Sequence, residues 1–305
     1  MTYFYKAYNL RVRSAFEVPE MLPIPPIDPV DVTIRISNKD FPPLHPVHPL
    51  QVFPEGVVYR WYRVGTVMIR EGREIILDPL PDAEPTLSAD IIANNAMAII
   101  LHQRGFFVMH ASAVLTEHGA VAFAGESGFG KSTTAASFGQ RGFTILSDDI
   151  VSLDLSAANP VPLMSPAFPQ LKLLPDAVES LIGGVDALPL QFESAHKYVY
   201  RQDNHFPDAP QPLRAIYLLD RGDETRIEPV PPRQALLELF PHSYIARQLR
   251  MYNLDMLRAT KTEGTHFINL SRLATQVPVR RLRRSFAPGE LALLPDLISE
   301  DLAHL

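Results

Sequence analysis

The segment that decides the fold reads Ala120-Val-Ala-Phe-Ala-Gly125-Glu-Ser-Gly-Phe-Gly130-Lys131-Ser132-Thr-Thr. Its centre, residues 125–132, fits the phosphate-binding pattern G-x-x-x-x-G-K-[ST]. The apolar run at 120–124 predicts a buried strand, and residues 132–140 predict a helix with an alanine-rich face. Strand, glycine-rich turn and helix in this order form the frame that the pattern requires. The sequence therefore favours a phosphate-binding loop over an ordinary glycine-rich surface turn.

The residue types of this loop suit the phosphates of a nucleotide. Its glycines allow unusual backbone dihedrals and a close approach to phosphate oxygens, and the amides at the helix start form a cradle for an anion. We expect Lys131 to reach the outer phosphates and the Ser132 hydroxyl to hold Mg²⁺. The predicted nucleotide contacts are Gly125, Glu126, Ser127, Gly128, Phe129, Gly130, Lys131, Ser132 and Thr133.

Length, composition and net charge restrict the classes of protein to which this chain can belong. The chain of 305 residues is 46% hydrophobic and 20% charged, which is typical of a folded protein with one large domain or two smaller ones. A net charge of -6 argues against binding to nucleic acid or to an anionic membrane. No apolar run approaches a membrane span, and the first residues do not resemble a signal peptide. We therefore expect a cytoplasmic protein, and the oligomeric state stays open, a homo-oligomer included.

The distribution of proline predicts that the chain consists of two units. Residues 1–87 are rich in proline and predict a β-rich unit, with strands at 32–36, 57–64, 66–70 and 74–77 and a hairpin turn at 71–73. Ser88 is expected to cap a helix that ends before Gly105 and packs on the sheet through Ile92, Ala96, Ile99 and Ile100. This helix opens the second unit, residues 88–305, which holds the phosphate-binding loop.

The C-terminal half carries weaker signals. An apolar strand is predicted at 213–219 with 225–230 paired to it, and further strands at 267–270 and 277–282. Residues 191–212 are polar and read either as a loop that closes over a site or as a solvated loop without a role. The basic run Arg280–Arg284 either binds phosphate or an acidic partner, or forms a solvated strand edge. The polar segment holds His196, Lys197, Tyr198, Arg201, Asp203 and His205.

Two acidic residues follow the next apolar run. Residues 143–146 predict a strand beside the loop strand, and Asp148 and Asp149 come directly after it. Side chains near the carboxyl ends of such strands face the ligand crevice. One carboxylate would then help to hold Mg²⁺ while the other accepts a proton from an attacking hydroxyl; the alternative is a turn-forming pair. His110, in a run expected beside the loop strand, either contacts phosphate, orients the base or is a core histidine.

Three segments together resemble the HPr serine kinase/phosphorylase family: residues 109–114, 125–135 and 140–149. The resemblance implies an α/β fold, the atypical P-loop kinase domain whose mixed sheet is similar to that of phosphoenolpyruvate carboxykinase. It also implies transfer of the γ-phosphoryl group of ATP to a protein serine. Residues 165–182 depart from the family's glutamate-containing signature. The layout is closer to HPr-kinase-related enzymes that accompany ribosomal peptide-modifying systems, lasso-peptide kinases included.

The resemblance also implies roles for single residues. Lys131 and the loop amides would bind phosphates, Ser132 would bind Mg²⁺, and Asp149 would be the catalytic base. Asp148 and His110 would support the metal, the phosphate or the base, so Ser132 and Asp148 form the expected metal site.

The expected function is an ATP- and Mg²⁺-dependent kinase acting on a serine of a peptide or small protein. Two alternatives stay open. One is a small-molecule kinase or a carboxykinase-like phosphotransferase. The other is a nucleotide sensor without catalysis, with the N-terminal unit and Arg280–Arg284 binding a partner.

Overall fold

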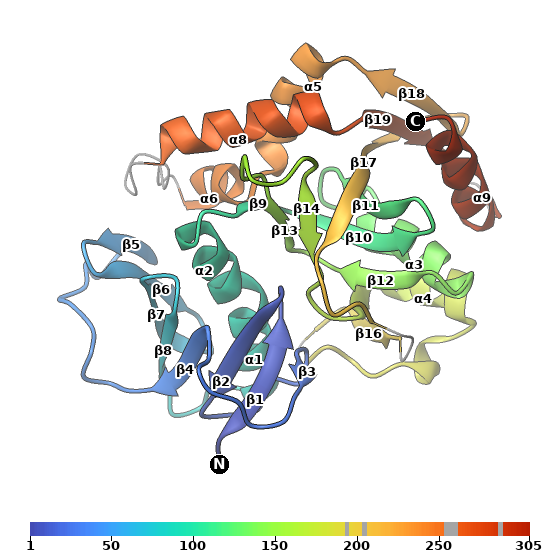
Figure 1. Cartoon of the computed structure of the whole chain (residues 1–305). Helices are drawn as coiled ribbons and strands as arrows, with labels where there is room; N and C mark the ends of the chain where they lie inside the picture. The colour runs from blue at the N-terminus through green and yellow to red at the C-terminus, as the bar shows by residue number, and fades with distance from the viewer. Residues whose placement is uncertain (193–194, 203–205, 253–261, 286–288) are drawn as a thin grey trace.

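A computed structural model describes the chain except residues 193–194, 203–205, 253–261 and 286–288. Alternating apolar residues build its first sheet (Figure 1), as predicted for 32–36, where Val32 and Ile34 are buried. The predicted turn at 71–73 joins two neighbouring strands. Within the described residues this sheet has eight strands, in the order β3 (Leu22–Pro23), β1 (Tyr3–Ala7), β2 (Leu10–Ser14), β4 (Val32–Ile36), β8 (Glu74–Pro79), β7 (Gly65–Arg70), β6 (Gly56–Trp61) and β5 (Leu50–Phe53).

The helix predicted from Ser88 begins three residues earlier. It comprises α1 (Pro85–Ile91), a π-helical stretch η1 (Ile92–Ala96) and α2 (Met97–Gln103). Proline suits a first helical position, where its missing N–H would have no partner in any case. The Ser88 hydroxyl lies inside the helix and donates to Glu84 O at 2.9 Å, so the predicted cap is wrong. The predicted end before Gly105 is confirmed.

The apolar face of this helix packs on the N-terminal sheet. All four predicted face residues are fully buried and share one core cluster with Val12 and Ile69 of the sheet. The same cluster includes Phe168 and Tyr244 from the second half of the chain. In Figure 1, α1 and α2 lie between the first strands and the second sheet. The division into units at residue 87 stays a prediction.

The second sheet carries the phosphate-binding loop. Its strands follow the order β12 (Thr144–Ser147), β10 (Ala111–Thr116), β11 (Gly119–Ala124), β17 (Gln211–Arg221), β14 (Leu163–Ser165), β13 (Val151–Asp154) and β9 (Phe107–Met109), with β19 (Val279–Arg284) on β17 and β18 (Arg226–Val230) on β19. The strand and helix predicted around the loop are confirmed as β11 and α3 (Lys131–Gln140).

Two predicted strand neighbours are wrong. β12 pairs with β10 and not with β11, because β10 runs antiparallel to β11 and takes the place beside it. β18 pairs with β19 and not with β17, because β19 lies parallel to β17 along residues 216–221. The first pair follows from the β10–β11 hairpin, and the second joins distant parts of the chain. The mixed α/β class predicted from the sequence is confirmed.

Helices cover both faces of the second sheet. Val121 and Phe123 of β11 pack toward α3 and α9 (Glu290–Ala303), whereas Ala120 and Ala122 pack toward α5 (Pro232–Leu239) and α8 (Glu263–Gln276). The strand predicted at 267–270 is wrong because it lies within α8. There Leu270, Leu273 and Ala274 are buried at helical spacing. Figure 1 shows α8 above this sheet and α9 at its side.

Six further elements complete the part of the chain that the structure describes. They are β15 (Gln170–Leu173), α4 (Pro175–Ile182), η2 (Val185–Ala187), β16 (Tyr198–Arg201), η3 (Phe240–His242) and α6 (Tyr244–Tyr252). Part of the polar segment 191–212 is thus a strand, β16, which pairs with β15; the expectation of one continuous loop is wrong. Asp203 and His205 lie outside the described residues. None of the helices described is both long and apolar enough to cross a membrane.

Candidate active site

The glycine-rich turn from β11 into α3 closes around its own lysine. Gly128 and Gly130 have φ values of 83° and 82°, the left-handed region that glycine adopts at little cost. Lys131 Nζ donates to Gly125 O at 3.0 Å and to Glu126 O at 3.3 Å. Burial lowers the pKa of Lys131 below its ordinary value. A bound anion would therefore meet a partly desolvated ammonium at the helix start.

Arg284, at the end of β19, lies directly against this turn. A Cβ on Gly130 would come within 2.0 Å of Arg284 Nη2, so the guanidinium would have to shift to make room for it. The neighbouring arginines of the basic run pair elsewhere: Arg280 with Asp301, and Arg281 with Glu238 at 2.5 Å. The run is thus divided, and Arg284 is the member that lines the cavity described below.

Gly130→Ala is expected to destabilise the protein and to weaken nucleotide binding. A positive φ costs an alanine about 1–2 kcal/mol, and at this position the new methyl group would also displace the Arg284 guanidinium. Gly142→Ala is the matched control, because Gly142 has a φ of 86° with nothing within 4 Å of its added Cβ. Urea unfolding and ATP titration of both variants separate the two effects. Equal losses in both variants would show that Arg284 does not matter to the turn.

The Asp148 side chain connects α3 with strands β10 and β15 through hydrogen bonds. It is 2% exposed and accepts hydrogen bonds from Ser112 Oγ at 2.6 Å, Ser132 Oγ at 2.9 Å and Lys172 N at 2.9 Å. Burial and the nearby charge of Asp149 raise the pKa of Asp148. The resemblance implied Ser132 and Asp148 as a metal site, and in the structure the two side chains are in direct contact.

The Ser132–Asp148 hydrogen bond has the same length as the distance between two adjacent magnesium ligands. Mg²⁺ binds oxygens at about 2.0–2.1 Å in octahedral geometry, which places adjacent ligands about 2.9 Å apart. Ser132 Oγ and Asp148 Oδ1 are 2.9 Å apart. Among the residues that the structure describes, no group of three or more His, Cys, Asp or Glu side chains could hold a metal ion. The residues fit Mg²⁺ that is completed by water and phosphate oxygens, as this ion usually is at nucleotides.

Asp149 lies in a strained turn beside the loop. Its φ is 62°, and Ile150 N donates across it to Asp148 O at 2.7 Å, the three-residue bond of a γ-turn. Such conformations cost energy and cluster at functional sites. The turn directs the two neighbouring carboxylates differently: Asp148 faces Ser132, whereas Asp149 faces a lysine and a histidine.

The lysine is Lys172 of β15, which the sequence analysis missed. Its Nζ lies 3.1 Å from Asp149 Oδ2 and 2.8 Å from Asp90 Oδ1, and its side chain is 5% exposed. Burial disfavours the ammonium, but Asp149 and Asp90 outweigh it and raise the pKa of Lys172. Burial likewise opposes ionisation of Asp149, and Lys172 outweighs it, so the pKa of Asp149 is lowered. A lysine inside the apolar run Leu171–Leu174 was the available signal.

His110, between β9 and β10, completes this group. Its Nδ1 lies 2.9 Å from Asp149 O and 4.0 Å from Asp149 Oδ1. Burial lowers the pKa of His110 to about 4, so the ring is neutral at pH 7. Because a carbonyl only accepts, Nδ1 carries the proton, and Nε2 is left as an acceptor. The histidine thus holds the Asp149 backbone in place.

Lys172→Met is expected to destabilise the protein by about 3–5 kcal/mol at pH 7, because it leaves two carboxylates without their shared cation. Adding Asp90→Asn should recover part of this loss. The wild-type pKa of Asp149 lies below its ordinary value, so the ion pair contributes stability above about pH 4 that is lost as the pH falls further. Urea unfolding from pH 7 to pH 3 should therefore show the deficit shrinking in acid. A deficit independent of pH would contradict this account.

One cavity of about 1130 Å³ joins these residues. Of the predicted nucleotide contacts, Ser127, Gly128, Gly130, Lys131, Ser132 and Thr133 line it; Gly125, Glu126 and Phe129 do not. His110 and Asp149 also line it, and Asp148 lies behind Ser132. Five cations face three acidic residues in its wall: Lys131, Lys172, Lys197, Arg247 and Arg284 against Asp90, Asp149 and Asp176. In a chain of net charge -6, this concentration of positive charge favours a polyanionic ligand.

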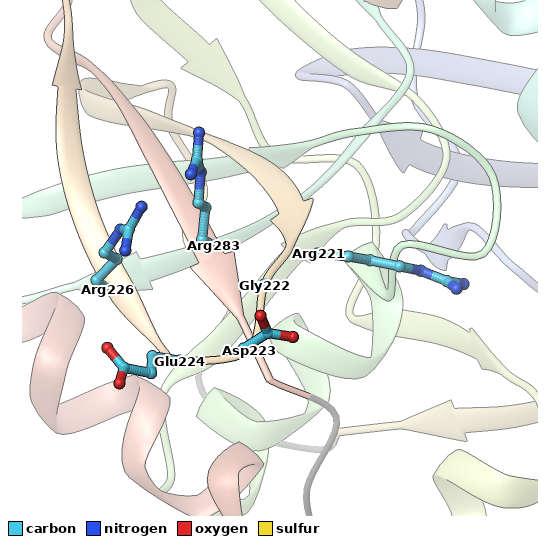
Figure 2. Close-up of a pocket in the computed structure, with 6 residues that line it drawn as sticks. All are labelled: Arg221, Gly222, Asp223, Glu224, Arg226 and Arg283. Atoms are coloured by element: carbon cyan, nitrogen blue, oxygen red, sulfur yellow. The ribbon is translucent and has the colours of Figure 1, made fainter.

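A smaller hollow of about 650 Å³ lies at the turn between β17 and β18. Figure 2 shows Asp223 and Glu224 at this turn, with Arg226 and Arg283 on the adjoining strands. Opposite charges pair here, since Arg226 Nε lies 2.9 Å from Glu228 Oε1 and Arg283 Nε lies 3.8 Å from Asp220 Oδ2. Arg221 extends away from the group and lies 5.3 Å from the ring centre of Phe129. The mixed charges make this hollow a poor anion site.

Comparison with known proteins finds similarity among solved structures alone. No protein-family model and no curated protein matches the sequence. Among solved structures, the Hpr(Ser) kinase/phosphatase from Coxiella burnetii is similar at 14% sequence identity and a TM-score of 0.32, over 65% of this chain and 91% of that chain. The function is therefore argued from the site itself.

Proposed function

We propose that this protein is an ATP- and Mg²⁺-dependent kinase that phosphorylates a serine hydroxyl of a peptide or small protein. The observation that carries the proposal is the contact between the phosphate-binding loop and the acidic pair. Ser132 bonds Asp148 at 2.9 Å, and Asp149 comes next in the chain on the wall of the same cavity. A loop that only bound phosphate would have no need of a carboxylate poised beside it.

The nucleotide would lie along the start of α3. The loop amides, Lys131 and Arg284 would bind the phosphates, and Ser132 with Asp148 would hold Mg²⁺. The metal would neutralise the charge that develops on the phosphate oxygens. Lys131 would exchange its carbonyl partners in the loop for phosphate oxygens, which bind an ammonium more strongly because they are ionised.

In the transfer step the acceptor oxygen forms a bond to the γ-phosphorus while the bond from that phosphorus to the bridging oxygen of ADP breaks. The hydroxyl proton passes to the Asp149 carboxylate. The ion pair with Lys172 makes Asp149 a weak base. A weak base suits phosphoryl transfer, because its loose transition state depends mainly on positioning and on the stabilisation of charge. His110 would keep Asp149 directed at the incoming hydroxyl.

The direct test is transfer from γ-labelled ATP to a panel of serine peptides, small proteins and small hydroxyl compounds, followed by mass spectrometry of the products. Phosphoserine in a peptide supports the proposal. Phosphorylation restricted to small compounds would favour the small-molecule kinase. ATP binding without transfer to any acceptor would favour the nucleotide sensor and contradict the proposal.

A further inference from the structure

The cavity continues beyond Asp149 to an end that the phosphate-binding loop does not reach. A chain of contacts leads there: Asp149 to Lys172 at 3.1 Å, Lys172 to Asp90 at 2.8 Å, and Asp90 Oδ1 to Asn94 Nδ2 at 3.0 Å. Asn94 belongs to η1, and π-helical turns of this kind occur frequently at functional sites. This end of the cavity therefore lies across the base from the nucleotide.

The walls of this end come from α1, η1 and α6. Leu87 and Ile91 supply apolar surface, while Asn95 and Gln248 supply amides. Gln248 is 2% exposed and accepts a hydrogen bond from Tyr59 Oη at 2.5 Å, which fixes the orientation of its amide. Leu87, Ile91 and Asn95 are half-buried and Gln248 is buried, so this end of the cavity can receive a side chain or a small molecule.

Arg247 of α6 lines the cavity beside Tyr244 and Gln248. Within the part of the chain that the structure describes, no acidic side chain forms an ion pair with it. Its charge nevertheless acts on the site. Burial is the main cause that lowers the pKa of His110 and the pKa of Lys131, and the positive charge of Arg247 also lowers both. An arginine directed at a site without an acidic partner is suited to an anionic ligand, because its planar fork binds a carboxylate or phosphate through two hydrogen bonds.

Three of the other four cations in the cavity wall already have close contacts of their own, and the fourth, Lys197, belongs to the segment that leads into β16. Lys131 bonds loop carbonyls, Lys172 is held between two carboxylates, and Arg284 lies against Gly130 where the phosphates would bind. Arg247 comes from a different element, whose neighbouring residues form the acceptor end of the cavity. We therefore expect the anionic group that Arg247 binds to belong to the acceptor and not to the nucleotide.

We infer that the acceptor hydroxyl is flanked by an anionic group, a carboxylate or a phosphate ester, and that Arg247 binds this group. The inference rests on the proposed kinase function and narrows its acceptor. Two sources offer the same chemistry: a serine next to an acidic side chain in a peptide, and a small hydroxylated anion.

Binding in the absence of turnover tests the inference. The protein is saturated with Mg²⁺ and a non-hydrolysable ATP analogue, which occupies the phosphate-binding loop. Matched probes are then titrated calorimetrically: glycerol 3-phosphate against glycerol, D-glycerate against glycerol, and an Asp-Ser peptide against its Asn-Ser counterpart. We expect at least one anionic probe to bind about 10-fold or more tighter than its neutral partner. The probe that does so identifies the source.

Arg247→Gln should remove this preference, Arg247→Lys should keep part of it, and Arg233→Gln should keep all of it, since Arg233 is exposed on α5. Thermal unfolding of each variant checks that it folds. If Arg247→Gln does not fold, the comparison is made with Arg247→Lys. Anionic and neutral probes that bind alike to the wild type would overturn the inference, as would loss of nucleotide affinity alone in Arg247→Gln. Because the readout is binding, a preference for anions without phosphate transfer would refute the kinase and leave the anion site standing.

Discussion

Lys131→Ala is expected to abolish detectable phosphate transfer and to weaken ATP binding by about 10²–10³-fold. The ammonium is the cation held inside the phosphate-binding loop, 3.0 Å from Gly125 O, and it is 8% exposed. A cation held in a partly desolvated position interacts with phosphate more strongly than one in water. Titration with a fluorescent ATP analogue and the labelled-ATP transfer assay measure the two effects separately.

The matched control for this variant is Lys39→Ala, because Lys39 is exposed in the N-terminal unit. It should bind ATP as the wild type does. Unfolding curves show whether Lys131→Ala keeps its fold, because the loop carbonyls lose a hydrogen-bond donor. If Lys131→Ala folds and binds ATP with unchanged affinity, the loop is not the nucleotide site.

Asp149→Asn is expected to lower the rate of phosphate transfer by about 10²–10⁴-fold, the usual contribution of a general base. ATP affinity should change much less, because Asp149 faces Lys172 and His110 and the predicted metal ligands are Ser132 and Asp148. The substituted amide keeps the shape of the carboxylate but cannot accept the hydroxyl proton. Single-turnover rates at saturating ATP give the effect on the chemical step.

Asp223→Asn provides the comparison, since Asp223 is an exposed carboxylate at the turn between β17 and β18 (Figure 2). It should transfer phosphate at the wild-type rate. Equal rates for Asp149→Asn and the wild type would remove Asp149 from the role of base.

The sequence predicts local features of this fold well and distant pairings poorly. The strand, turn and helix around Lys131 are set by residues within about twenty positions of one another, and they form as predicted. The prediction placed residues 143–146 beside β11, but β10 forms a hairpin with β11 and β12 pairs on the far side of β10. The helix around Phe267 shows a second limit: Phe267 and Ile268 are 60% and 55% exposed, so two apolar residues in sequence favoured a strand that the burial pattern does not support.

The same distinction separates the site residues that could be predicted from those that could not. Ser132, Asp148 and Asp149 belong to recognisable patterns close to one another in sequence. Lys172 forms ion pairs with Asp90 and Asp149, which are separated by more than fifty positions in the sequence. No local sequence pattern therefore indicates that Lys172 belongs to the site. Arg247 occurs in a polar stretch of a helix, and only the cavity distinguishes it from a solvated arginine.

The shared core has a consequence for where this protein can be divided. Ile92, Ile99 and Ile100 bury their side chains against strands of the first sheet, and the same cluster reaches Tyr244 at the far end of the cavity. A chain cut at residue 88 would leave a broad apolar surface in water, and it would also lose Tyr59, which fixes the Gln248 amide. The β-rich segment therefore supports the helical stretch 85–103, whose residues Leu87, Asp90 and Asn94 line the cavity, and losing it should disable the half that carries the phosphate-binding loop.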